Sequence, residues 1–345
     1  MSEPLTSPDE PVRIGLVGAG RIGTSHASLL VERVPGARLV AVADPRPEAA
    51  AALATKVGTR AVSEPAEVFG DPDIEAVVIT ASSVAHADLI TAATAAGKAV
   101  FCEKPMGMTL EEIDRGIAAA SKAGVPLQAG FNRRFSADFA TARRLIDDGA
   151  IGTPQLMRSV TRDPGLADPG AVPPWTIFTQ TLIHDFDTLL WLNPGAEPVS
   201  VYATADALVA PDFKESGLLD TAVVVITFDN GARAVAEASF SAAYGYDVRG
   251  EVFGSRGMVT MGGGPRSALV LSTASGRAIE TVRGDVELFA DAYAAELAEF
   301  AEAVRANRAP AVTGEDARRA FGVALAAIAS VESGVPVDVS TGAAR

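Results

Sequence analysis

Two short segments of the sequence contain residues whose types and spacing could do chemistry. The first is a glycine-rich turn in which Gly18 permits a tight bend, Gly20 leaves room for a pyrophosphate, and Gly23 lets the following helix pack closely. The second is the triplet Glu-Lys-Pro at 103–105, which follows a predicted strand. A lysine beside a bound nicotinamide could accept or give a proton while a hydride moves. Together the two segments predict a dinucleotide-dependent redox reaction.

The surroundings of the glycines strengthen this interpretation. An apolar run at 12–17 predicts a strand entering the turn, and the spacing at 21–32 predicts a helix leaving it, whose N–H groups would face phosphates. Asp44 ends a second predicted strand about 20 residues further on, where a carboxylate accepts hydrogen bonds from the ribose hydroxyls of NAD. Arg46 would suit the 2′-phosphate of NADP, so the sequence favours NAD and leaves NADP open. The alternatives are a bare turn and a solvated strand-end acid.

Lys104 is one of only five lysines in the chain. The proline after it restricts its backbone to extended conformations. A lysine removed from water has a lowered pKa and can shuttle a proton. The alternative is a surface lysine paired with Glu103.

His184 is one of three histidines and the second candidate for proton transfer. On a helix, Gln180, His184 and Asp187 fall on one face by their spacing. A lone helical histidine is more often structural, but these polar neighbours favour a functional role. The sequence has no HExxH or CxxC spacing, so no metal site is expected. The single cysteine, Cys102, is interpreted as a packing residue.

The overall composition narrows the class of protein. The 345 residues suffice for two domains with full cores, and 48% of them are hydrophobic. A net charge of -14 argues against nucleic acid or an anionic membrane as a partner. Residues 1–13 lack the pattern of a signal peptide, no apolar run is long enough to span a membrane, and a lone cysteine suits a reducing compartment. We expect a cytoplasmic protein.

The elements that must position these residues fall into two groups. Early in the chain, short apolar runs alternate with helical patterns, which predicts an α/β domain with βαβ units and a parallel sheet covered on both faces. We place a dinucleotide-binding Rossmann domain at 1–127 and a substrate-binding and oligomerisation domain at 128–345. The predicted strands of the first domain are 12–17, 39–43, 60–62, 76–80, 99–102 and 126–130, and its helices are 21–32, 47–57, 85–96 and 110–123.

The second domain is predicted to be α+β, with a large, mostly antiparallel, open-faced sheet. The Asp-Asn-Gly at 229–231 is the clearest hairpin turn. Helix 180–192 lies within this domain. Helices 288–307 and 315–333 could pack back on the first domain before a last strand at 335–339. The uncovered sheet face predicts a homodimer or homotetramer. The other predicted strands are 156–161, 199–205, 222–228, 232–239, 246–253, 258–261 and 268–273.

With these segments in view, the chain resembles the Gfo/Idh/MocA oxidoreductase family over nearly its whole length, and within that family the inositol 2-dehydrogenases. The resemblance implies a Rossmann domain, an open-faced second sheet, NAD(P), a small cyclitol or sugar substrate, and often dimers or tetramers. Besides the glycine-rich turn and the Glu-Lys-Pro triplet, the motifs that carry it are 130–135, 162–164, 183–187, 220–223, 244–247 and 251–255.

The resemblance also implies roles for particular residues. Lys104 and His184 would be catalytic. The full set expected to bind the cofactor is Gly18, Gly20, Arg21, Ile22, Gly23, Asp44, Arg46, Thr80, Ser82, His86, Glu103 and Lys104. The set expected to bind the substrate is Lys104, Asn132, Arg133, Asp163, Gln180, Thr181, His184, Tyr244 and Tyr246.

One departure from the family pattern concerns the substrate. Inositol dehydrogenases usually carry an aspartate one turn before the histidine, where this chain has Gln180, and paired glycines just upstream, where it reads Pro-Trp-Thr-Ile-Phe at 174–178. A glutamine cannot stabilise an imidazolium by charge, although Asp187 could replace the aspartate. The sequence therefore predicts reversible hydride transfer between NAD and a secondary alcohol of a cyclitol or sugar. Two alternatives stay open: a reductase of an oxo- or amino-sugar or cyclitol, and a non-catalytic dinucleotide-binding protein.

Overall fold

The computed structural model divides the chain into two compact units. The first holds the described residues up to Phe135 together with Ala290–Arg318, and the second holds the remainder. The chain passes from the first unit to the second between Phe135 and Ser136, beyond residue 127, and the domain boundary expected there stays a prediction. The residues that the structure describes are 10–166, 168–264, 267 and 269–342.

The first unit is built on a six-stranded parallel sheet. Its strands are β1 (Val12–Val17), β2 (Ala37–Ala43), β3 (Arg60–Val62), β4 (Ala76–Ile79), β5 (Ala99–Glu103) and β6 (Leu127–Gly130). Every neighbouring pair in the order β3-β2-β1-β4-β5-β6 is parallel. Strands β4 and β5 are buried along their whole length, as apolar runs covered on both faces should be. The strand order reverses between β1 and β4, and sheets of this kind bind ligands at the carboxyl ends of the strands at such a point. The predicted Rossmann fold is confirmed.

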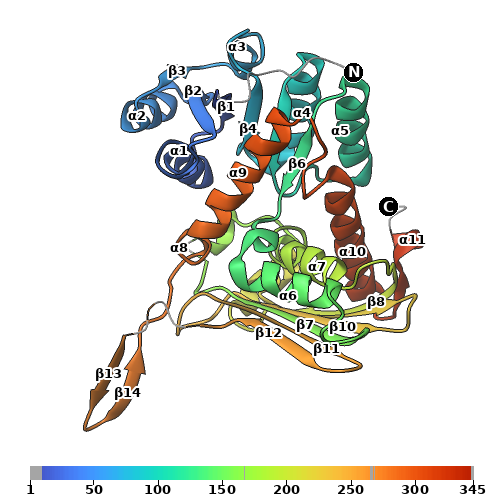
Figure 1. Ribbon diagram of the computed structural model, residues 1–345. Helices are drawn as coiled ribbons and strands as arrows, with labels where there is room; N and C mark the ends of the chain where they lie inside the picture. Colours follow the sequence, from blue (N-terminus) through green and yellow to red (C-terminus); the bar gives the residue numbers. More distant parts are fainter. Residues whose placement is uncertain (1–9, 167, 265–266, 268, 343–345) are drawn as a thin grey trace. The chain divides into compact units, whose positions relative to one another are not determined.

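Helices flank this sheet, and one of them comes from far along the chain (Figure 1). They are α1 (Arg21–Arg33), α2 (Pro47–Val57), α3 (Pro65–Phe69), α4 (His86–Ala95), α5 (Leu110–Ala123) and α9 (Ala290–Arg305), with the short 3-10 turns η1 (Ser83–Ala85) and η2 (Asn132–Phe135). Helix α9 belongs to the first unit and packs against α1.

The second unit is built on a seven-stranded mixed sheet. Its strands are β7 (Pro154–Arg162), β8 (Pro198–Asp206), β9 (Thr221–Phe228), β10 (Arg233–Ser239), β11 (Asp247–Gly254), β12 (Met258–Gly262) and β15 (Val337–Asp338). In the order β12-β11-β7-β10-β9-β8-β15, only β7 and β10 pair in parallel. The β9–β10 hairpin turns at Gly231, whose φ of 88° favours glycine. The predicted, mostly antiparallel sheet is confirmed.

Helices of the second unit cover one face of its sheet (Figure 1). They are α6 (Ala137–Asp147), α7 (Leu182–Trp191) and most of α10 (Gly314–Ser333), and α7 packs on β7 and β10. Alternate residues of the strands are exposed on the other face, as the two-residue period of a strand requires. The large apolar residues exposed along these strands are Leu156, Val199, Tyr202, Val223, Val225, Phe253 and Met258.

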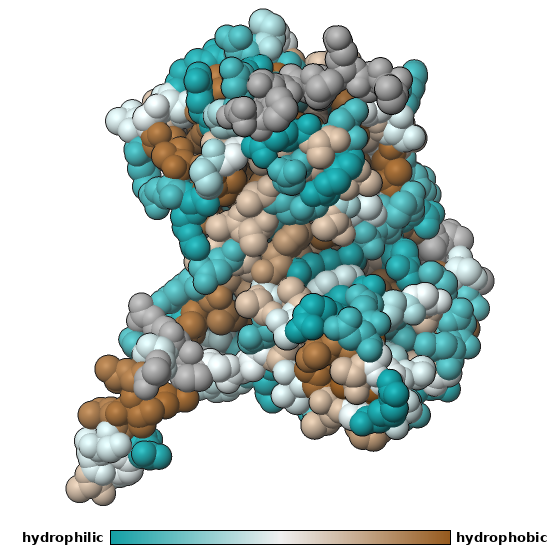
Figure 2. Space-filling model, in the orientation of Figure 1, coloured by the Kyte–Doolittle hydropathy of each residue, from teal (hydrophilic) through white to brown (hydrophobic). Residues whose placement is uncertain are grey.

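A separate two-stranded sheet extends the second unit. It consists of β13 (Val270–Thr273) and β14 (Gly276–Ile279), and both strands are exposed along their whole length. Figure 2 shows hydrophobic side chains gathered on this hairpin. The large apolar residues exposed there are Leu269, Val270, Leu271 and Ile279.

The structure differs from the predicted elements in several places. The helix predicted at 180–192 begins with a π-helical turn, η4 (Ile177–Thr181), before α7 starts. The helix predicted at 288–307 is divided into α8 (Asp285–Leu288) and α9. The strand predicted at 335–339 is reduced to β15, because the chain turns into α11 (Val339–Gly342). The sequence patterns did not predict α3, α6 or β14.

Two expectations fall partly outside the described residues. Residues 1–9, which include most of the segment where no signal peptide is expected, lie outside the described residues. So does Ala268, the first residue of the strand predicted at 268–273. Within the described part of the chain, no helix is both long enough and apolar enough to cross a membrane.

Candidate active site

The glycine-rich turn between β1 and α1 is shaped for a phosphate-bearing ligand. Gly18 has a φ of 109°, and a Cβ there would lie 2.6 Å from the backbone nitrogen of Ala81. A Cβ on Gly23 would overlap the carbonyl oxygen of Gly18 and lie 2.8 Å from Thr80 Oγ1. A Cβ on Gly20 would meet nothing within 4 Å. The packing of the turn therefore requires the first and third glycines, whereas the second borders open space that a pyrophosphate could take.

The amino terminus of α1 favours anions. Its N-cap residue has no side chain to cap the helix, and its first turn, which begins with Arg21 and Ile22, contains no acidic residue. The N–H groups and the positive end of the helix dipole suit phosphate oxygens. Thr80 steadies the turn from the end of β4, because its hydroxyl donates to Gly18 O at 2.8 Å and its N–H donates to Val17 O at 2.8 Å.

Asp44 directly follows β2 and is 4% exposed. Its carboxylate accepts hydrogen bonds from the N–H of Ala19 at 2.7 Å and from the backbone N–H and Nε of Arg46 at 2.9 and 3.1 Å. Burial by itself would raise the pKa of Asp44, but the hydrogen bonds and charge of Arg46 and the bond from Ala19 hold it below the ordinary value. An ionised carboxylate thus stands where a ribose would be recognised. The side chain of Arg46 is 62% exposed and could turn toward a 2′-phosphate.

The Glu-Lys-Pro triplet completes β5 and continues beyond it. Because β1, β4 and β5 are parallel, the triplet emerges at the same edge of the sheet as the glycine-rich turn. Lys104 is half-buried, and a cis peptide bond joins it to Pro105. The N–H of Lys104 donates to Glu103 Oε2 at 3.2 Å. The triplet therefore places a half-buried lysine at the carboxyl edge of the sheet, beside the glycine-rich turn.

His86 supports the triplet from α4. It is buried, and its two ring nitrogens lie 2.7 Å from Pro105 O and 3.0 Å from Ala81 O. Burial lowers its pKa, although the two backbone contacts oppose that shift. His86 thus ties the triplet to the loop after β4, where Ser82 is exposed at the N-cap of η1. The predicted contacts of His86 and Ser82 with the cofactor stay predictions.

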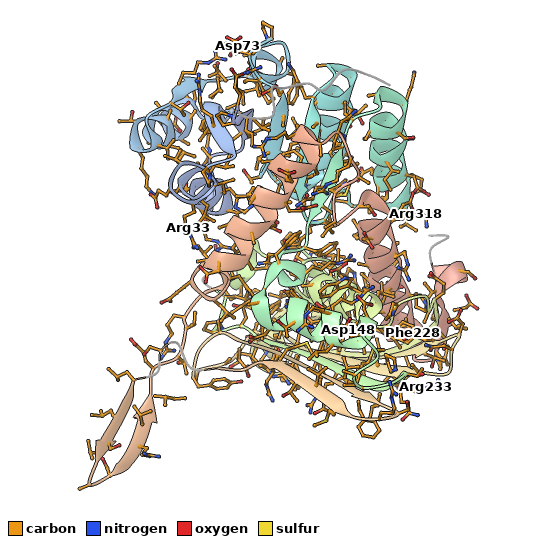
Figure 3. All side chains as sticks on the ribbon, viewed as in Figure 1. Arg33, Asp73, Asp148, Phe228, Arg233 and Arg318 are labelled. Carbon is orange, nitrogen blue, oxygen red and sulfur yellow. The ribbon has the colours of Figure 1, made fainter. Side chains whose placement is uncertain are left out.

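Sequence reasoning missed a buried cluster behind the triplet. His26 of α1, Glu103 and Glu296 of α9 are all buried, and their donor atoms lie within 4.8 Å of one another. His26 Nε2 is 3.0 Å from Glu103 Oε1. Arg33, labelled in Figure 3, lies at the end of α1 and pairs with Asp291 of α9 at 2.8 Å. The available signal was a glutamate at a position of α9 that the helical period places on the buried face.

The charges in this cluster are unequal. Burial would raise the pKa of Glu103, but His26 and then Lys104 outweigh it, and the pKa lies below the ordinary value. Burial and the charge of Glu103 raise the pKa of Glu296 well above its ordinary value. Both carboxyl oxygens of Glu296 lack a hydrogen-bond partner among the described residues. The pKa values of the two buried glutamates are therefore shifted in opposite directions.

The candidate substrate residues are divided between the two units. Asn132 and Arg133 lie in η2 of the first unit, and each is 2% exposed. Asp163 follows β7 in the second unit. Its N–H donates to Ser239 O at the end of β10, and its carbonyl oxygen accepts from the N–H of Ala242, each at 2.8 Å. Tyr244 is exposed, and its hydroxyl donates to a carboxylate oxygen three residues on at 2.9 Å. Tyr246 directly precedes β11 and is half-buried. Their contacts with a substrate stay predictions.

The segment that carries the second catalytic candidate is irregular. Trp175 has a φ of 62°, which is rare for a bulky residue. It leads into the π-helical turn η4, which contains Gln180 and Thr181, and then into α7, which contains His184. The helix predicted at 180–192 is therefore wrong in its first turn, and α-helical spacing does not set the positions of Gln180 and His184. Single π-helical turns are frequent at functional sites.

A buried aspartate anchors this segment to the sheet. Asp185 accepts hydrogen bonds from Ser159 Oγ at 2.5 Å and Thr161 Oγ1 at 2.8 Å, both on β7. Sequence reasoning quoted Asp185 in a motif but missed this role. Asp187 is 1% exposed. That it takes the role of the aspartate which this chain replaces by Gln180 stays a prediction.

Comparisons with known proteins agree with this geometry. A family model described as an oxidoreductase family with an NAD-binding Rossmann fold, GFO_IDH_MocA, matches residues 12–131, and the GFO/IDH/MocA C-terminal domain matches residues 139–260. The chain is 37% identical over 330 residues to a myo-inositol 2-dehydrogenase of Thermotoga maritima, covering 93% of this chain and 96% of the relative. It is 38% identical over 334 residues to a scyllo-inositol 2-dehydrogenase (NAD(+)) of Bacillus subtilis, covering 96% of this chain and 97% of the relative.

A solved structure shows the same similarity in three dimensions. The structure of scyllo-inositol dehydrogenase from Lactobacillus casei with bound cofactor NAD(H) and scyllo-inositol superposes with a TM-score of 0.91 at 28% identity. The match covers 96% of this chain and all of the other. The likeness therefore extends through both units.

Proposed function

Because the chain belongs to the Gfo/Idh/MocA family of oxidoreductases with an NAD-binding Rossmann fold, we propose that it transfers a hydride between NAD and a secondary alcohol of an inositol-like cyclitol or a sugar. One observation carries the proposal. Lys104 is half-buried at the edge of the parallel sheet that also presents the glycine-rich turn and Asp44. The names of the similar inositol dehydrogenases support the substrate class.

Each part of the first unit has a separate task in this reaction. When bound, NAD supplies the hydride acceptor. The glycine-rich turn and the amino terminus of α1 hold the pyrophosphate, and Asp44 orients the ribose hydroxyls. Lys104 accepts the proton of the substrate hydroxyl as its carbon is oxidised, an assistance that contributes roughly 10²- to 10⁴-fold in rate. In the second unit, His184 is the other residue that we assign to this proton transfer.

The segment before His184 supports a substrate other than myo-inositol. It combines Gln180, which carries no charge to stabilise an imidazolium, with the left-handed backbone of Trp175 and a π-helical turn. The uncharged Gln180 leaves reduction of an oxo- or amino-sugar or cyclitol as the second candidate reaction, since the side chain before His184 differs from the family pattern.

The remaining expectations concern the cofactor, the assembly and the location. The carboxylate of Asp44 favours NAD over NADP, since it would repel a 2′-phosphate. We propose a homodimer or homotetramer formed through the open face of the seven-stranded sheet, whose exposed apolar residues support it. Sedimentation velocity tests this assembly. A cytoplasmic location stays a prediction.

A substrate panel tests the proposed function. Purified protein would be assayed with myo-inositol, scyllo-inositol, other cyclitols and pyranoses plus NAD or NADP, and with the matching ketones plus NADH, by absorbance of the reduced nicotinamide. We expect turnover with at least one member in one direction. Tight binding of NADH without turnover on the whole panel would contradict the proposal and favour a non-catalytic dinucleotide-binding protein.

A further inference from the structure

The reaction as described above uses neither His26 nor Glu296, which lie beside Glu103. The three residues come from α1, β5 and α9, and they are 0%, 8% and 0% exposed. Two carboxyl groups and an imidazole this close together and away from water cannot all carry their usual charges. A buried arrangement of this kind persists when the groups share a proton.

We propose that His26, Glu103 and Glu296 form a proton-sharing cluster in which Glu296 keeps its proton at neutral pH and, through Glu103, positions Lys104 for reaction. Glu296 is then a positioning residue of the active site, because it acts through another side chain. The inference rests on the function proposed for Lys104, and its test is chosen so that the two can fail separately.

The surroundings of the two glutamates explain which one keeps the proton. Glu103 Oε1 faces His26 Nε2 at 3.0 Å, and the positive charge of Lys104 also favours its ionised form. Glu296 feels mainly burial and the negative charge of Glu103. Among the described residues, neither oxygen of Glu296 has a hydrogen-bond partner. A protonated Glu296 is neutral, which leaves one negative charge facing His26 instead of two.

Two other titratable groups border the cluster. The ring of Tyr293 on α9 lies 5.4 Å from that of His26, centroid to centroid. Cys102 precedes Glu103, and burial raises its pKa well above the ordinary value, so it stays a neutral thiol. Cys102 therefore adds no negative charge to the cluster at neutral pH.

The connection from Glu103 to Lys104 is short and tightly packed. The N–H of Lys104 donates to Glu103 Oε2 at 3.2 Å. A Cβ on Gly130 of β6 would lie 3.2 Å from both the Cα and Oε2 of Glu103, so a side chain at this position would press on the glutamate. On the far side of Lys104, His86 contacts Pro105 O. A shift of Glu103 therefore moves the backbone of Lys104, and a displacement of about 1 Å at a reacting group can lower turnover about 10²-fold.

A metal ion is the alternative occupant of this cluster. Donor atoms within 4.8 Å of one another could share an ion. Histidines that bind metals, however, almost always donate their other ring N–H to an acceptor. His26 Nδ1 has no hydrogen-bond partner among the described residues, so a shared proton fits the cluster better.

Two substitutions of Glu296 test whether the protein needs a neutral hydrogen-bond donor at this position. Glu296→Gln keeps a neutral donor of the same shape, so we expect kcat, KM and their pH dependence to match the unaltered protein. Glu296→Met removes the donor, and we expect kcat to fall about 10²-fold, with the Kd for NAD unchanged. Glu302→Gln, on the exposed part of the same helix, is the matched control for the loss of a carboxylate.

Two spectroscopic measurements test the cluster without any substrate. In infrared spectra at neutral pH, the carbonyl stretch of a buried protonated carboxyl group should be present in the unaltered protein and absent in Glu296→Gln. With ¹³C-labelled lysine, the chain has only five signals to resolve, and Lys104→Met identifies the one from Lys104. We expect this signal to titrate identically in Glu296→Gln and to shift in Glu296→Met.

Three results would overturn the inference. The first is an infrared band that survives in Glu296→Gln. The second is a Lys104 signal that shifts in Glu296→Gln, because Glu296 would then be charged in the unaltered protein. The third is a stoichiometric divalent metal in the purified protein that Glu296→Gln loses. If no substrate is turned over but the spectra agree with expectation, the proposed function fails while the proton-sharing cluster stands.

Discussion

The two regions that carry the catalytic candidates are built in opposite ways. In the glycine-rich turn and the Glu-Lys-Pro triplet of the first unit, each residue has a general physical reason for its type, such as the overlap that any side chain on Gly23 would cause. In the segment from Trp175 to His184, general rules are broken. A tryptophan takes a φ of 62°, an arrangement that costs about 1–3 kcal/mol, and a π-helical turn interrupts the helix. The first region serves a cofactor common to many enzymes, and the second contains Gln180, where the family pattern predicts an aspartate.

The largest expected effect concerns the lysine of the regular region. Lys104→Met should lower kcat by about 10²- to 10⁴-fold, because it removes the general base. The Kd for NAD, measured by fluorescence titration, should stay nearly unchanged. Lys122→Met on the exposed side of α5 is the control, and it should be fully active. A fully active Lys104→Met variant would show that Lys104 is not the general base and that the first region carries no catalytic residue.

A second effect concerns the pH dependence of stability. Because the pKa of Glu296 is raised in the folded protein, the folded state holds one more proton than the unfolded state above the ordinary value of 4.5. This contribution to the free energy of unfolding falls by up to about 1.4 kcal/mol for each pH unit as the pH rises toward the folded pKa. Glu296→Gln removes it, so its stability relative to the unaltered protein should grow with pH in urea titrations. A difference that stays constant between about pH 5 and 8 would contradict the assignment.

A third effect separates two glycines of the same turn. Gly23→Ala places a Cβ against the Gly18 carbonyl and should lower the free energy of unfolding by about 1–3 kcal/mol or more. Gly20→Ala meets no protein atom, so stability should change by less than about 1 kcal/mol while NAD binding weakens. Urea titration and NAD titration of both variants measure the contrast. Equal losses of stability would show that Gly20 is also required by packing.

The smallest expected effect tests the irregular region. Gln180→Asp restores the charge that inositol dehydrogenases usually carry before the histidine. We expect kcat/KM for myo-inositol to rise about tenfold, or about 1.4 kcal/mol in transition-state free energy. Gln180→Asn, which shortens the side chain without adding charge, should give no gain. If neither variant gains, Gln180 is not the reason that this region differs.

The sequence predicted local features well because they follow from local chemistry. The turn with Gly18, Gly20 and Gly23, the strands beside it and the hairpin at Gly231 each depend on a few neighbouring residues. The parallel order of the first sheet followed from the alternation of strands and helices. The Cys102 thiol is buried, as its position in a strand indicated.

Other features could not be predicted because they depend on contacts between distant residues. His26, Glu103 and Glu296 meet only after α9 returns to the first unit, and no spacing in the sequence records that meeting. The π-helical turn was hidden because its residues fit an α-helical pattern equally well. Asp185 gave no local sign of its bonds to β7, because its partners lie on a strand formed by a different part of the chain.

The exposed hairpin β13–β14 has a consequence for handling the protein. A lone two-stranded hairpin is only marginally stable in water, and this one displays apolar side chains on both strands. If two copies of the chain bury their β13–β14 hairpins against each other, dilution will separate the copies and unfold the hairpins. The melting temperature would then rise with protein concentration, and assays at nanomolar enzyme would lose activity over time that concentrated stocks retain.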